Sequence, residues 1–156
     1  MTAPRLEPQC EHVLARSFVS RALAAALTAT CRASVDGFAS RRGLDDAIEA
    51  VIEFRGPSTG RFVVAVPRSL LPKLFGDLVP RRGSAEVELA EALGALARSA
   101  CSQVLRAKHD TAFGVVFSDP VLSPARPAVD GEIVVRVFGS WLAANLFDAD
   151  TATGVS

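Results

Sequence analysis

Apolar positions recur with helical spacing in two long segments of the chain. In residues 10–30 they form one buried face of an expected amphipathic helix. In residues 84–106 they gather on one side, and the other side carries a polar stripe within an arc of about 80°, at roughly 100° per residue. The stripe comprises Ser84, Glu88, Glu91, Arg98 and Ser102, and the apolar side comprises Leu89, Leu93, Leu96, Ala100 and Val104. We therefore expect residues 84–106 to form a helix with one core face and one presented face.

Two pairs of β-rich segments predict hairpins. Residues 47–54 and 61–66 flank a connection containing Gly56 and Gly60, which can adopt positive φ. Residues 132–138 and 141–147 flank Gly139-Ser140, a pair suited to a two-residue type II′ turn. A helix over residues 141–147 is the alternative, because the leucine and alanine residues there favour one.

Weaker patterns fill the rest of the chain. Residues 32–36 and 112–117 have strand composition, and residues 68–78 predict a short helix that Pro67 begins. Residues 118–130 contain three prolines and are expected to form a connection without a regular element. The order of helices and strands predicts an α+β domain, with long amphipathic helices packed on antiparallel strands.

Length and composition favour one domain. With 156 residues, 49% of them hydrophobic, the chain can bury a full core. We assign residues 9–148 to this single domain, and residues 1–8 and 149–156 to an N-terminal and a C-terminal tail.

The balance of charge argues against nucleic-acid and membrane partners. Seventeen basic residues offset seventeen acidic ones, so no overall field attracts a polyanion. The longest apolar run, residues 22–27, is far shorter than the roughly 20 residues of a membrane span. The first twelve residues are polar and have no signal-peptide pattern. We therefore expect a cytoplasmic protein.

Neither the cysteines nor known catalytic motifs indicate a cofactor. The three cysteines form no CxxC pair and are expected to be reduced thiols. Cys10, His12, Cys101 and His109 lack the spacing of a zinc site. The Rossmann, Walker A, GxSxG and HExxH motifs are missing from the sequence. We expect no metal and no cofactor.

The polar stripe is the one candidate for chemistry. Glu88 and Glu91 stand three residues apart and could perform acid and base catalysis, although the solvated face of a helix gives the same pattern. Ala95 leaves the stripe flat enough for another protein's backbone to approach, as in a docking helix. Ser84 suits a helix N-cap, and Trp141 a core or interface anchor.

The helix segment resembles the signature helix of the CheX branch of the CheC, CheX and FliY phosphatase family. The family pattern is Asp or Ser, three residues, Glu, two residues and Asn, then a small residue four positions on and a proline beyond the helix. Here Ser84, Glu88, Glu91 and Ala95 follow that spacing. The resemblance covers residues 10–148, including EAVIEFRGPSTGRFVVAVP, SDPVLSP and EIVVRVFGSWLAANLF.

The resemblance implies an α+β chemotaxis phosphatase fold and a partner in two-component signalling. In the family, the Glu contacts a conserved lysine of a phosphorylated receiver domain, and the Asn amide orients the attacking water. A neutral amide suits this role because it adds no negative charge beside the phosphoryl group. A homodimer paired through edge strands is a further expectation from the family.

The sequence departs from the family at the amide position. Glu91 stands where the family has Asn, and a register that makes Glu91 the family Glu places Gly94 there. Gln103 is the only amide on this helix, Asn145 is the only asparagine of the chain, and Pro120 lies further downstream than the family spacing.

Three functions remain open. We expect a CheX-like domain that docks a response-regulator receiver or similar signalling partner through Ser84, Glu88, Glu91, Ala95 and Arg98, with phosphatase activity lost or weakened. An active aspartyl-phosphate phosphatase would use Glu88 to dock and Glu91 to handle water. A non-catalytic scaffold or oligomerisation module would bind neither form of a receiver.

Overall fold

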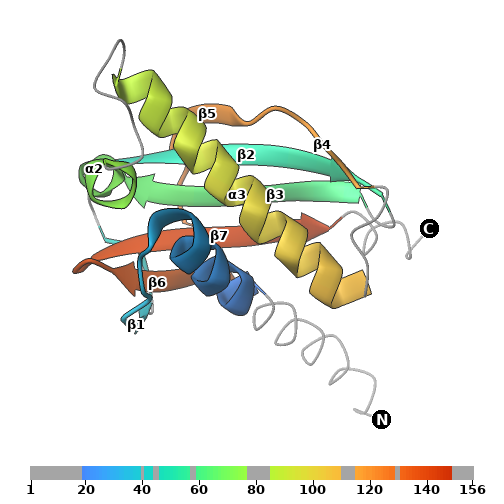
Figure 1. Ribbon diagram of the computed structural model, residues 1–156, viewed down its shortest axis with the longest axis horizontal. Coiled ribbons are helices and arrows are strands. Elements are labelled where there is room, and N and C mark those ends of the chain that lie inside the picture. The colour runs from blue at the N-terminus through green and yellow to red at the C-terminus, as the bar shows by residue number, and fades with distance from the viewer. Residues whose placement is uncertain are drawn as a thin grey trace.

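An antiparallel sheet with helices on one face forms the protein (Figure 1). The computed structural model describes residues 19–39, 41–43, 46–56, 59–76, 85–109, 115–128 and 131–148. Within them the sheet has seven strands in the order β1-β6-β7-β3-β2-β4, and β5 also pairs with β2. The strands are β1 (Gly37–Ala39), β2 (Ala47–Arg55), β3 (Thr59–Pro67), β4 (Val116–Phe117), β5 (Val121–Pro124), β6 (Ile133–Val137) and β7 (Ser140–Asp148). The expected α+β class is confirmed.

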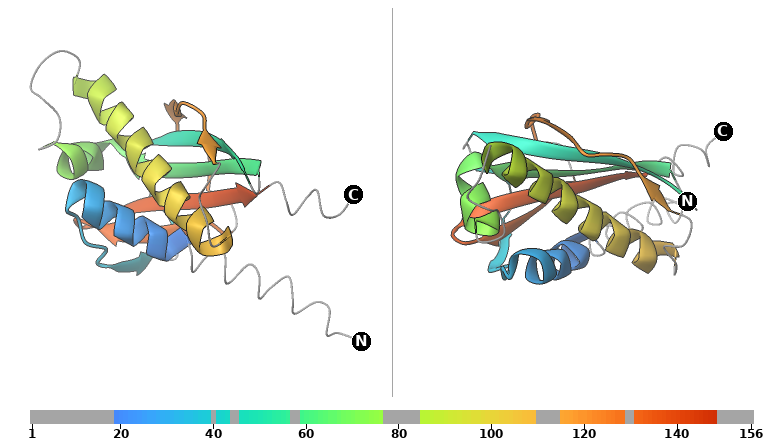
Figure 2. Two further views of the ribbon diagram at one scale, coloured as in Figure 1. Left: turned by 45° about the vertical axis from the view of Figure 1, so that its right-hand side comes forward. Right: turned by 45° about the horizontal axis from the view of Figure 1, so that its top comes forward.

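The long helix α3 (Ala85–His109) crosses the sheet diagonally, and the helix over residues 19–31 lies beside it on the same face (Figures 1 and 2). A 3₁₀ turn η1 (Arg68–Leu70) and the short helix α2 (Leu71–Phe75) follow β3. The predicted helix over 68–78 is thus confirmed in its position, but its regular part ends at Phe75. Residues 10–18 of the first predicted helix lie outside the described residues.

Successive side chains of each strand point to opposite faces of the sheet, so the buried side chains form two clusters. In β3, Phe62, Val64 and Val66 face the helices and belong to the main core. Side chains of the other face form a smaller cluster that no helix of the described residues covers. Its buried members are Ala47, Ala65, Val134, Trp141 and Ala143. Trp141, 6% exposed, is therefore a core residue on this second face, as one of the two sequence interpretations expected.

Both predicted hairpins are confirmed. β2 pairs with β3 from Ala47↔Pro67 to Arg55↔Thr59, and β6 pairs with β7. The alternative helix over residues 141–147 is wrong, because β7 lies between β6 and β3 and is paired on both sides. Tertiary pairing outweighs the helical preference of its alanines here.

Of the two weaker strand predictions, that over 32–36 is wrong, and that over 112–117 is confirmed for Val116–Phe117, while residues 112–114 lie outside the described residues. Residues 32–36 are not a strand, because Arg32 adopts φ 53° where the first helix ends, and pairing begins only at Gly37. The amides of Arg32 and Ala33 donate to the carbonyls of Thr28 and Leu27, which satisfies the end of the helix. Of the predicted strand over 112–117, only Val116–Phe117 pair as β4 within the described residues.

The proline-rich segment 118–130 is not free of regular structure, contrary to the prediction. β5 lies within it and pairs with β2 from Ile48↔Pro124 to Val51↔Val121. An edge strand tolerates proline because one side of it needs no donors. Residues 121–124 form a strand because β2, which is distant in sequence, pairs with them.

The turn between β6 and β7 is one residue earlier than predicted. Val137 pairs with Ser140, so the central residues are Phe138 and Gly139, with φ of 51° and 72°. Positive φ at both positions defines a type I′ turn and not the predicted type II′ turn. Phe138 is therefore a non-glycine residue held in the left-handed region, although it is 46% exposed.

We expect Phe138→Asn to raise the free energy of unfolding by about 1 kcal/mol, because asparagine adopts this conformation at lower cost. Urea denaturation measures the change. Phe38→Asn is the matched control, since Phe38 is also exposed, at 67%, but has no positive φ. Equal effects of the two substitutions would contradict the backbone explanation.

Candidate functional site

One stripe of α3 is exposed along the outer surface of the domain. Glu91, Ala95 and Arg98 are exposed at the spacing i, i+4 and i+7, and Ser102 is half-buried. Side chains on the opposite side have at most 1% exposure; they are Leu93, Leu96, Ala97, Ala100, Cys101, Val104 and Leu105. The predicted division of this helix into a core face and a presented face is confirmed for residues 91–106.

The first part of the predicted site is only partly within the described residues. Glu88 belongs to α3, three residues before Glu91, but its side chain lies outside the described part, as does that of Leu89. Ser84, the predicted N-cap, also lies outside it. The structure therefore leaves the pairing of Glu88 with Glu91 a prediction that rests on helical spacing.

Pro120 lies directly against α3. A Cβ placed on Gly94 would be 2.4 Å from Cγ of Pro120 and 2.8 Å from its Cβ, so only glycine fits at this crossing. This contact brings the segment before β5 to the side of the helix. It does so at Gly94, which stands between Glu91 and Ala95 in the sequence. Pro120, which lies further downstream in sequence than the family spacing, thus packs against α3 at Gly94.

The two described cysteines, Cys31 and Cys101, are buried in part or in full. Burial raises the pKa of the Cys31 thiol to about 11 and that of Cys101 to about 12, so both stay protonated at neutral pH. Both are free thiols. Among the described residues no cluster of potential metal ligands occurs. Cys10, His12 and the His109 side chain lie outside them.

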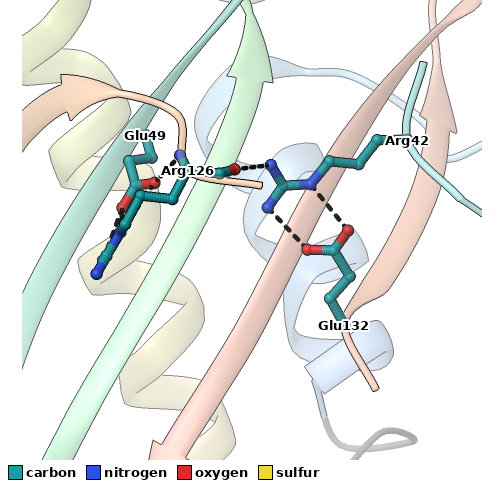
Figure 3. A network of polar contacts seen from close by, with 4 residues as sticks. All are labelled: Arg42, Glu49, Arg126 and Glu132. Atoms are coloured by element: carbon teal, nitrogen blue, oxygen red, sulfur yellow. Dashed lines mark hydrogen bonds and ion pairs between the residues drawn. The ribbon is translucent and has the colours of Figure 1, made fainter. Parts of the chain in front are cut away.

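A charged network that no local sequence pattern indicates lies on the sheet face opposite α3 (Figure 3). Glu49 on β2 is 1% exposed, and its Oε1 accepts a hydrogen bond of 2.6 Å from the backbone N–H of Arg126. Nη2 of Arg126 lies 3.0 Å from its Oε2. Arg42 donates two bonds of 2.8 Å to Glu132 and one of 2.7 Å to the carbonyl of Arg126. This network fixes the segment after β5 to the sheet.

Burial alone would raise the pKa of Glu49, but the hydrogen bonds and charge of Arg126, with Arg42 further away, outweigh it. The pKa therefore lies below the ordinary value of 4.5. Since the folded state favours the carboxylate, this group stabilises the fold above that value, and the contribution disappears as the pH falls through the lowered pKa.

Solved structures of CheC-like and CheX proteins share this fold of a long helix laid across an antiparallel sheet. A CheC-like superfamily protein from Shewanella sp. PV-4 matches with a TM-score of 0.62 and 11% identity, over 83% of this chain and 94% of that chain. Chemotaxis protein CheX from Vibrio vulnificus matches with a TM-score of 0.61 and 12% identity, over 84% of this chain and 96% of that one.

A chain of the CheX–CheY–BeF₃–Mg²⁺ complex from Borrelia burgdorferi also has this fold. Its TM-score is 0.53 at 12% identity, over 85% of this chain and 96% of that chain. No protein-family model and no curated protein matches the sequence. At these identities the likeness is one of fold, and it confirms the fold that the resemblance predicted.

No helix in the described part of the chain is long and apolar enough to cross a membrane.

Proposed function

We propose that this chain is a CheX-like signal-transduction domain that docks the receiver domain of a response regulator through α3, and that its phosphatase activity is lost or weakened. One observation carries the proposal: Glu91 is exposed on the outer stripe of α3, and in the family motif that the helix resembles its position belongs to an amide. The CheX–CheY complex from Borrelia burgdorferi supports the class of partner, since one chain of that complex shares the fold.

The stripe has the chemistry of a docking surface. Glu91 is exposed and available to a lysine or basic patch of the partner, and Glu88 is one helical turn before it. Ala95 has no side chain beyond Cβ, so a partner backbone can approach the helix closely. Arg98, exposed one turn further on, adds a charge at the rim that favours one orientation.

Both possible registers of the family motif lack an amide donor. In the first, Glu91 occupies the Asn position, and an ionised carboxylate accepts hydrogen bonds but donates none. In the second, Gly94 occupies it, and Pro120 fills the space that a side chain would need. A carboxylate about 4 Å from a phosphoryl oxygen costs on the order of 4 kcal/mol at an effective dielectric near 20.

An active phosphatase is the second candidate, and the exposure of Glu91 is the observation that favours it. A carboxylate within reach of water can act as a general base. No observation on the described residues specifically favours the scaffold function. A homodimer through an edge strand stays a prediction; β1 has one described partner strand, β6, and its Phe38 is 67% exposed.

Binding to beryllofluoride-loaded receiver domains of the source organism, in the presence of Mg²⁺, tests the proposal. We expect the unmodified protein to bind one of them and the double variant Glu88→Lys/Glu91→Lys to bind at least about 100-fold more weakly, because two attractions become repulsions. Glu53→Lys is the matched control, since Glu53 is exposed on β2. Circular dichroism verifies that each variant is folded.

Undiminished binding by the folded double variant would refute the assignment of the site. Failure of the unmodified protein to bind any receiver, in either phosphorylation state, would refute receiver docking and leave the scaffold.

A further inference from the structure

A pocket opens on the sheet face opposite α3. Its volume is about 150 Å³. The floor is formed by neighbouring positions of β3 and β7, where Arg61 pairs with Phe147 and Val63 with Asn145. Arg42 and Glu132 line it from one side, and Arg126 with Pro127 from the segment after β5. The network of Figure 3 thus builds part of its wall.

The hydrogen bonds of the network link each of its carboxylates to one guanidinium. All three guanidinium nitrogens of Arg42 donate hydrogen bonds, to Glu132 and to the carbonyl of Arg126. Nε and Nη2 of Arg126 donate to Glu49. The two carboxylates that line the pocket are therefore each neutralised by one guanidinium, and these four groups have a structural role.

The positive charge of Arg61 is not neutralised by a carboxylate of this network. Three guanidinium groups line the pocket against two carboxylates, so the lining carries one excess positive charge. Among the described residues, the Arg61 guanidinium stacks on the Phe147 ring, whose centroid is 4.8 Å from Cζ. The ring holds the guanidinium over the floor and leaves its N–H donors available. Asn145 lines the same floor and is half-buried.

We propose that this pocket binds a small organic carboxylate, with the carboxylate on Arg61 and Asn145 and the apolar part over Val63, Ala143 and Phe147. A guanidinium presents parallel N–H groups that match a carboxylate, and an amide adds a further donor. The volume corresponds to about five water molecules at roughly 30 Å³ each, which suits an acid of a few carbon atoms or one ring. The apolar side chains of Val63, Ala143 and Phe147 in the lining favour an organic acid over a fully hydrated inorganic anion.

Titration of the ¹⁵N-labelled full chain with benzoate, followed by NMR, tests this proposal. We expect saturable shifts confined to the amides of β3 and β7 around residues 61–63 and 143–147. Benzamide, which has the same shape without the charge, should bind at least about tenfold more weakly, because the charge-assisted bond to Arg61 is lost. Arg61→Gln should weaken benzoate binding by a similar factor.

Arg55→Gln is the matched control, since Arg55 is exposed on the adjacent strand and does not line the pocket. Asn145→Leu removes the amide at nearly constant volume and should weaken binding without moving the apolar contacts. Shifts spread over the whole surface, equal binding of benzamide, or unchanged binding by Arg61→Gln would overturn the proposal. Saturable binding of inorganic phosphate but not of benzoate would overturn the organic class of the ligand.

The pocket and the stripe of α3 lie on opposite faces of the sheet, so the two proposals fail independently. Loss of benzoate binding in Arg61→Gln tests the pocket alone, and receiver binding by the same variant should be unchanged.

Discussion

Glu91→Asn is expected to accelerate release of inorganic phosphate from a phosphorylated receiver by about 100- to 1,000-fold over the unmodified protein. The substitution removes a negative charge from beside the phosphoryl group and supplies an amide that can orient the attacking water. A barrier lowered by on the order of 4 kcal/mol corresponds to about a thousandfold in rate. Glu91 is exposed on α3, so the change should leave the fold intact.

Phosphate release is measured with a receiver that has been acyl-phosphorylated in the presence of Mg²⁺. Glu91→Ala separates the two parts of the effect, since it removes the charge without supplying an amide. We expect it to be slower than Glu91→Asn, and Glu53→Asn to behave as the unmodified protein.

Two outcomes would contradict the degenerate-site proposal. The first is release of phosphate by Glu91→Asn no faster than by Glu91→Ala, which would mean that the amide has no role at this position. The second is accelerated release by the unmodified protein that is lost in Glu91→Ala. Glu91 would then be the catalytic carboxylate of an active phosphatase.

Gly94→Val is expected to lower the free energy of unfolding by about 3 kcal/mol. Its Cβ would lie 2.4 Å from Cγ of Pro120, far inside van der Waals contact, and a pyrrolidine ring cannot rotate away. Overpacking of this kind costs typically about 1–3 kcal/mol, and a β-branched residue also adapts poorly to a helix. Urea denaturation with a constant m-value measures the loss.

Ala95→Val is the matched control, because Ala95 is the next residue of α3 and is exposed. It should cost less than about 1 kcal/mol, which reflects helix propensity alone. In a Pro120→Gly background the penalty of Gly94→Val should fall by more than half, because the clashing ring is gone. An unchanged penalty would show that the contact with Pro120 is not its cause.

Local periodicity was enough to predict α3 and both hairpins. The 3.6-residue repeat separates Leu93, Leu96 and Ala100 from Glu91 and Arg98, and it does so in any environment that offers one apolar surface. The segments of β2 and β3 are similarly rich in β-branched residues around a turn. The exposed stripe of the candidate site followed from the same repeat.

Weak local patterns did not predict the elements that depend on pairing between segments distant in sequence. β5 contains a proline and is short, and it exists as a strand because β2, whose paired residues are 70 to 76 positions away in sequence, offers it hydrogen bonds. The turn shifted to Phe138-Gly139 because the register of β6 and β7 is set by the faces that their side chains bury. Turn composition alone favoured the neighbouring pair.

The charged network had no signal in the sequence. Glu49 looks like an ordinary polar position of a strand, and its partner Arg126 is 77 residues away. The chain after β5 folds back over the sheet and brings Arg126 to Glu49. This pairing offsets the free-energy cost of burying the carboxylate. The pocket that Arg61 and Asn145 line has the same origin, since β3 and β7 are neighbours only in the folded sheet.

By itself the sequence determined the amphipathic helix, its outward stripe and the carboxylate at position 91, because side-chain identity and helical spacing are local properties. Tertiary structure decided the contact of Gly94 with Pro120, the edge strands, and the basic pocket on the second face. Each of these depends on which distant segments lie side by side, and that is settled by the burial of both sheet faces together.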